Sequence, residues 1–89
     1  MYLCVLDGEK ITDREMLHDI LAEQLALPEW YGRNLDALYD CLTERREAAE
    51  IRILQISVLE ERLGGYAKAL ENVLSAIAGE NPEISVLVQ

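Results

Sequence analysis

Apolar residues recur along the chain with two spacings, and these spacings predict where strands and helices lie. Short runs rich in aliphatic and β-branched residues predict strands at 2–6, 51–56 and 84–88. The last run is almost continuously apolar, so we expect that strand to be buried on both faces. Two pairs of segments with helical spacing lie between these runs. The order strand, helix, helix, strand, helix, helix, strand predicts a small α/β domain with a three-stranded parallel sheet and about four helices.

Cap residues and a proline set the expected ends of the first two helices. The first begins at Thr12, which can form a capping box with Glu15, and it ends before Pro28, because the residue before a proline avoids helical geometry. The second begins after Asn34, a favourable N-cap residue, and continues to about Ala48.

The second pair of helices carries similar signals. Ser57 and Glu60 can form another capping box, and the glycine pair 64–65 ends this short helix. Apolar residues with helical spacing over 66–77 mark the fourth helix, and Gly79 suits the position just beyond its end.

The segment LPEWYGRNLDALYDCLT, residues 27–43, combines exposed charge with large aromatic residues. Helical spacing places three leucines (35, 38 and 42) on one side, which we expect to face the core. Asp36 and Asp40 fall together on the opposite side, where two like charges one turn apart destabilise a helix slightly. The two aspartates can simply be solvent-exposed residues of an acidic protein. Aromatic neighbours beside fixed charges also suit a protein-binding surface, although we expect at least one of Trp30 and Tyr31 to cover the core.

Length and charge narrow the choice of partner. Eighty-nine residues suit a single domain, over 1–89, and the net charge of −9 disfavours binding to nucleic acid or to an anionic membrane. The acidity suits a basic protein partner, or solubility alone.

The first residues do not resemble a signal peptide, and no apolar run is long enough to span a membrane. Cys4 and Cys41 form neither a disulfide framework nor a zinc site, so we expect a cytoplasmic protein with reduced cysteines.

An enzyme is the first alternative, and the sequence disfavours it. Asp36 and Asp40 could act as an acid–base pair only in a cleft that raises one pKa, which a convex helix face does not provide. The single histidine, His18, lies within the first helix and suits a structural role. No catalytic triad, phosphate-binding glycine loop or metal-ligand cluster is visible, so we expect no catalytic residues, no metal and no cofactor. An acyl carrier protein would need a serine at the start of a helix, and the segment RNLDALYDCL has none.

Residues 27–43 resemble the signature segment of the barstar family, whose members are intracellular inhibitors of barnase-like ribonucleases. The similarity extends along the chain, through an early strand ending in a DGE turn, a helix ending in LALPE and a final short strand. It implies a three-stranded parallel sheet packed with helices. It also implies an antitoxin-like inhibitor that blocks a ribonuclease active site with its second helix and the preceding loop, where carboxylates replace RNA phosphates.

The resemblance also implies which residues contact the partner. Asp40 matches the central acidic contact of the family, Asp36 its acidic neighbour, and Trp30 an aromatic residue that packs on the enzyme. The other expected contact positions are Tyr31, Gly32, Asn34, Leu35, Tyr39, which replaces a tryptophan, Thr43 and Glu80. The expected partner is one basic ribonuclease, bound by a chain that is a monomer when free.

Four positions depart from the family pattern. Arg45 replaces an interface tryptophan and Ala76 replaces an acid, while Arg33, Arg45 and Arg46 bring positive charge to an edge that should meet a basic enzyme. The alternative is therefore a barstar-like acidic module whose partner is not a ribonuclease.

Overall fold

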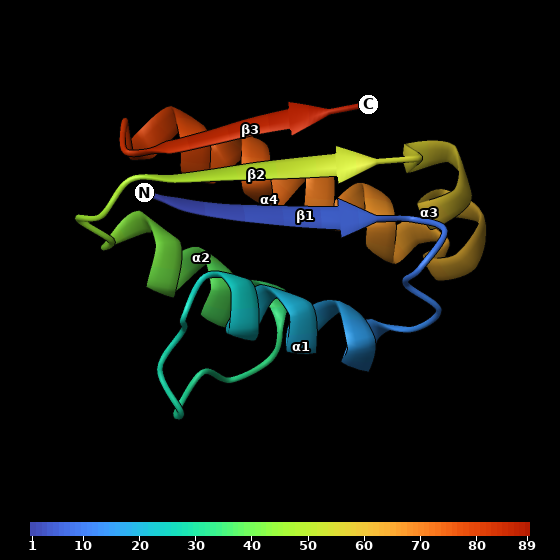
Figure 1. Ribbon diagram of the computed structural model, residues 1–89, viewed down its shortest axis with the longest axis horizontal. Helices are drawn as coiled ribbons and strands as arrows, with labels where there is room; N and C mark the ends of the chain where they lie inside the picture. Colours follow the sequence, from blue (N-terminus) through green and yellow to red (C-terminus); the bar gives the residue numbers. More distant parts are fainter.

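Three parallel strands form one layer of the computed structural model, which describes residues 1–89 (Figure 1). The elements are β1 (Tyr2–Asp7), α1 (Arg14–Gln24), α2 (Leu35–Thr43), β2 (Ala49–Leu54), α3 (Ile56–Leu63), α4 (Gly65–Glu80) and β3 (Ile84–Val88). The strand order is β1-β2-β3, and Ile51 in the central strand lies opposite Cys4 on one side and Val86 on the other. The predicted fold class, element order and parallel pairing are confirmed.

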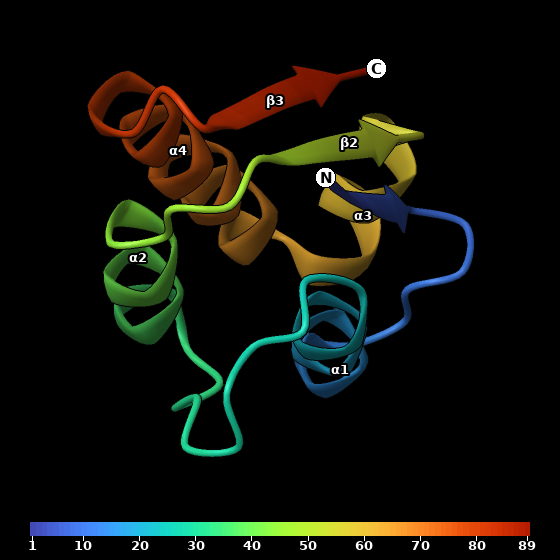
Figure 2. The same ribbon diagram turned by 60° about the vertical axis from the view of Figure 1, so that its left-hand side comes forward.

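All four helices lie on the same side of the sheet (Figure 2). The strands follow one another across the sheet in their order along the chain. Because both crossovers are right-handed and move across the sheet in the same direction, they place their helices on the same side. Alternate strand residues such as Leu6 and Ile53 are fully buried under the helices, whereas Leu3 on the open face is exposed. The expectation that the last strand is buried on both faces is wrong. β3 is an edge strand covered on one face, and its Leu87 and Val88 are exposed.

The ends of α1 differ from the prediction because other residues satisfy the free backbone groups. Asp13, not Thr12, is the N-cap, and its carboxylate accepts a hydrogen bond from the Met16 N–H at 2.8 Å. The helix ends well before Pro28, since Ala26 adopts a left-handed conformation (φ 52°) and the next N–H donates to the Ala22 carbonyl at 2.9 Å. This bonding pattern is the Schellman motif, in which glycine usually holds the left-handed position.

α2 begins as predicted and ends earlier than predicted. The Asn34 side chain accepts a hydrogen bond from the Ala37 N–H at 2.7 Å and caps the helix. The helix ends at residue 43 rather than near 48, because the buried Asn81 side chain donates to the carbonyls of Leu42 and Arg45, each at 2.8 Å. β2 accordingly starts at Ala49, two residues before the predicted strand.

The second helical pair also corrects the cap assignments. Gln55 precedes α3 in a left-handed conformation (φ 57°) with no side-chain cap, so the predicted capping box at Ser57 is wrong and that residue lies inside the helix. Gly64 ends α3, as predicted. Gly79 lies within α4 rather than beyond it, because the N–H of Asn81 still donates to the Ile77 carbonyl at 2.8 Å.

Both cysteines are free thiols in the structure. Cys4 is fully buried in β1, where burial raises the pKa of its thiol to about 12, and Cys41 is half-buried at the edge of α2. None of the helices combines the length and apolarity that crossing a bilayer would require.

Candidate protein-binding site

Helix α2 presents two carboxylates to solvent and buries its leucines. Leu38 and Leu42 are fully buried and Leu35 is half-buried, whereas Asp36 and Asp40 are exposed one turn apart. The predicted division of this helix into a core side and an acidic side is therefore confirmed. Asp36 lies in the first turn, where the free backbone N–H groups favour a negative charge.

A hydrogen bond between two expected contact residues joins α2 to the end of α4. The Tyr39 hydroxyl donates to the Glu80 carboxylate, which brings an acid far along the chain next to the acidic helix. This hydrogen bond is the main reason why the pKa of Tyr39 is raised, and the charges of Glu80 and Asp40 raise it further. Thr43 is half-buried one turn below Tyr39, and its hydroxyl donates to the Tyr39 carbonyl at 2.7 Å.

Trp30 and Tyr31, in the connection between α1 and α2, face in opposite directions. The Trp30 side chain is 78% exposed, whereas Tyr31 is only 5% exposed and belongs to the core. One of the two aromatics thus covers the core, as expected. The inclusion of Tyr31 in the contact surface needs correction, because its buried side chain supports the connection from inside. Gly32 and Asn34 are exposed, and an added Cβ at Gly32 would lie only 3.1 Å from the Ala37 Cβ.

His18 supports this connection, although no pattern in the sequence indicated that it belongs to the site. Its ring is 2% exposed and lies between two tyrosines, with Nδ1 2.7 Å from the Tyr31 hydroxyl and Nε2 2.7 Å from the Tyr66 hydroxyl. Burial lowers the pKa of His18, and the positive charge of Arg33 lowers it further, while Asp19 acts in the opposite direction. The structural role predicted for this histidine is confirmed. The helical spacing could indicate its burial but not its two distant partners.

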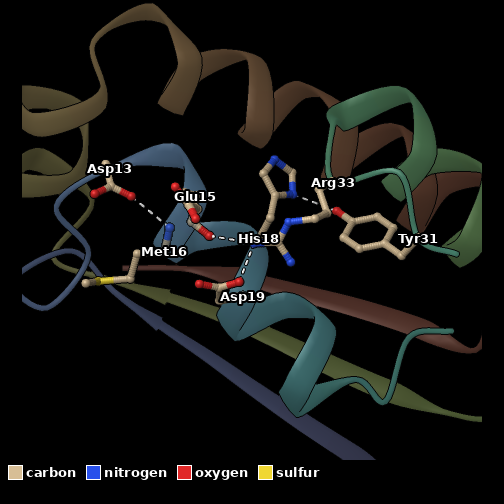
Figure 3. Close-up of polar contacts among 7 residues, drawn as sticks. All are labelled: Asp13, Glu15, Met16, His18, Asp19, Tyr31 and Arg33. Atoms are coloured by element: carbon tan, nitrogen blue, oxygen red, sulfur yellow. Dashed lines mark hydrogen bonds and ion pairs between the residues drawn. The ribbon is translucent and has the colours of Figure 1, made fainter. Parts of the chain in front are cut away.

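Two of the arginines that depart from the family pattern contact other parts of the same chain. Arg33 forms an ion pair with Asp19 of α1 (Figure 3). The Arg45 guanidinium lies 4.5 Å from the centre of the Tyr2 ring and donates to the Leu25 carbonyl at 2.8 Å. These contacts hold both side chains against the protein. Arg46 and Ala76 are exposed.

A hollow of about 460 Å³ lies between the start of α1 and the start of α2. Arg14, Arg33 and Asp36 are among its lining residues, and Asp40 is not. The two carboxylates of α2 therefore do not share a cleft, which is the arrangement that an acid–base pair would need.

Comparison with known proteins finds a matching family and a similar curated protein. The sequence model of one protein family, described as Barstar (barnase inhibitor), matches residues 1–89. A Bacillus subtilis (strain 168) protein named "Putative ribonuclease inhibitor YrdF" is 54% identical over 39 residues. That alignment covers 44% of this chain and 43% of the relative, so the similarity extends over less than half of either protein.

Proposed function

The chain belongs to the barstar family, and we propose that it inhibits a small basic ribonuclease of the barnase type. In this proposal α2 and the connection before it enter the active site of the enzyme. The observation that carries the proposal is the pair of exposed carboxylates, Asp36 and Asp40, together with the exposed ring of Trp30 in the connection before that helix. The ribonuclease-inhibitor name of the relative supports it.

The chemistry of this face suits an enzyme that binds RNA. A ribonuclease needs basic groups to hold the phosphates of its substrate, and a rigid helix with two carboxylates offers those groups alternative partners. Asp40 is exposed before binding, and it would be desolvated among the basic groups of the enzyme in the complex. The net charge of −9 also attracts a basic protein before contact, which speeds association at low ionic strength.

The proposed contact surface comprises residues from the connection, α2 and the end of α4. It consists of Trp30, Gly32, Asn34, Leu35, Asp36, Tyr39, Asp40, Thr43 and Glu80. The complex has one inhibitor and one enzyme, and the free inhibitor is a monomer. The proposal places the protein in the cytoplasm, and the two free thiols agree with a reducing compartment.

The same surface would serve an acidic module whose basic partner is not a ribonuclease. Exposed Arg46, just beyond the acidic helix, favours this second candidate, because a positive charge at that edge disfavours a strongly basic enzyme. In both cases the protein acts by binding and not as an enzyme, since Asp36 and Asp40 do not face a common cleft.

Inhibition of a purified ribonuclease tests the proposal. Barnase and related enzymes, including one from the source organism, are assayed on RNA with increasing amounts of this protein. Loss of activity that reaches completion near one equivalent is the expected result. Full activity at micromolar protein with every enzyme tested would remove the ribonuclease from the proposal and leave the acidic module.

A further inference from the structure

Arg33 has a backbone conformation that favours other residue types. Its φ is +56°, in the left-handed region, which glycine and asparagine adopt at lower cost than arginine. Its side chain reaches back to α1, where the guanidinium pairs with the Asp19 carboxylate and donates to the Glu15 carbonyl at 3.2 Å (Figure 3). These two contacts offset the unfavourable backbone and fix the point where the connection enters α2.

A second attachment to α1 lies two residues earlier, on the inner side of the connection. The Tyr31 hydroxyl and the His18 Nδ1 are 2.7 Å apart, and the histidine is held from its other nitrogen by Tyr66. Because His18 and Asp19 are consecutive residues of α1, one turn of that helix carries both attachments. Trp30 remains exposed beside them.

We infer that α1 holds the connection in its binding conformation, and that Arg33 is a positioning residue whose guanidinium clamps the connection to Asp19 rather than contacting the partner. A connection that is ordered before binding loses less conformational freedom in the complex, which increases affinity without a new contact. The inference rests on the proposed function for its effect on binding. The clamp itself is a property of the free protein.

The first experiment measures the mobility of the connection in the free protein. Trp30 is the only tryptophan, so its time-resolved fluorescence anisotropy reports on this segment alone. The variants are Asp19→Asn, Arg33→Gln and the double variant, with Glu23→Gln as control, an exposed acid one turn further along α1. We expect Trp30 to move more freely in all three clamp variants than in the wild type. In the control variant its mobility should equal that in the wild type. Equal anisotropy in Asp19→Asn and Glu23→Gln would overturn the clamp.

The second experiment measures dissociation from barnase, because changes in long-range charge act mainly on association. We expect either single clamp variant to dissociate about two- to fivefold faster, the range for an exposed ion pair, and the double variant to dissociate no faster than the singles. Additive effects, or slower dissociation of Arg33→Gln, would overturn the positioning role. If wild-type protein binds neither barnase nor any related ribonuclease tested, the ribonuclease proposal fails on its own, and the Trp30 measurement alone decides the clamp.

Discussion

The Tyr39 hydroxyl donates a hydrogen bond to the Glu80 carboxylate and so joins the two helices that carry the proposed contact surface. The carboxylate stabilises the neutral phenol, and its negative charge opposes formation of the phenolate, so both effects raise the pKa of Tyr39. Replacing Glu80 by glutamine removes the charge. We therefore expect Glu80→Gln to lower the pKa of Tyr39.

NMR titration of the tyrosine ring carbons measures this change in the free protein. Glu83→Gln is the control, because Glu83 is an exposed acid just beyond α4. A Tyr39 titration curve that is the same in wild type and Glu80→Gln would contradict the hydrogen bond.

His18 should make the protein less stable as the pH falls below neutrality. Burial lowers the pKa of the folded histidine below the ordinary value of 6.5, so the unfolded chain binds the proton more readily. The contribution of His18 to the free energy of unfolding is complete above pH 6.5 and is lost as the pH falls through the folded pKa. Since His18 is the only histidine, its imidazole NMR signal titrates alone and gives the folded pKa directly.

Denaturant unfolding between pH 5 and pH 8 completes this test. A folded pKa above 6.5, or a free energy of unfolding that increases from pH 7 to pH 5.5, would show that the ring is not held in its neutral form.

Asn81 should be among the most sensitive positions outside the hydrophobic core. Its side-chain nitrogen donates to the carbonyls of Leu42 and Arg45 in a site that is 5% exposed. Asn81→Asp keeps the size of the side chain but replaces the donor by an oxygen that repels both carbonyls. We expect a loss of about 1–3 kcal/mol in the free energy of unfolding, the cost of unsatisfied buried polar groups. An unchanged denaturation midpoint would contradict this role.

Ala26 offers a substitution that should stabilise the protein. Its left-handed φ of 52° penalises any side chain with a Cβ, and glycine removes that penalty. We expect Ala26→Gly to raise the free energy of unfolding by about 0.5–1 kcal/mol. The matched control is Ala76→Gly, which places glycine in the regular interior of α4 and should lower the stability by a similar amount. Thermal melts of both variants measure the difference, and a change of the same sign in both would contradict the left-handed assignment.

Much of the fold could be predicted because spacing alone specifies it. The helical positions of Leu38 and Leu42 and the apolar run at 51–56 were sufficient to place a helix and a strand. The ends of the helices were harder to predict, because neighbouring residues compete for the capping position. Asp13 caps α1 in place of its neighbour Thr12, and the side chain that ends α2 comes from Asn81, far along the chain.

The candidate site, too, could be predicted from the sequence only in part. Periodicity indicated that Asp36 and Asp40 share an exposed face, because both lie on one helix. The inward direction of Tyr31 and the pairing of Arg33 with Asp19 depend on how the connection packs on α1. Spacing along the sequence carries no information on such tertiary contacts.

Substitution of Asp40 shows whether the acidic face of α2 serves a basic partner. Asp40→Asn keeps the shape of the side chain and removes its charge, which leaves basic groups of the partner desolvated and unpaired in the complex. Glu47→Gln makes the equivalent change at an exposed acid outside the proposed surface. The stability of the free Asp40→Asn protein should stay the same or rise by a few tenths of a kcal/mol, because repulsion from Asp36 is relieved.

The most direct measurement is a calorimetric titration in which each variant is added to the free ribonuclease that the wild-type protein inhibits. We expect Asp40→Asn to bind far more weakly than Glu47→Gln, while the two proteins melt at similar temperatures. Equal affinities, or an Asp40→Asn protein that melts several degrees lower, would mean that this aspartate serves the fold and that the acidic face is not the binding surface.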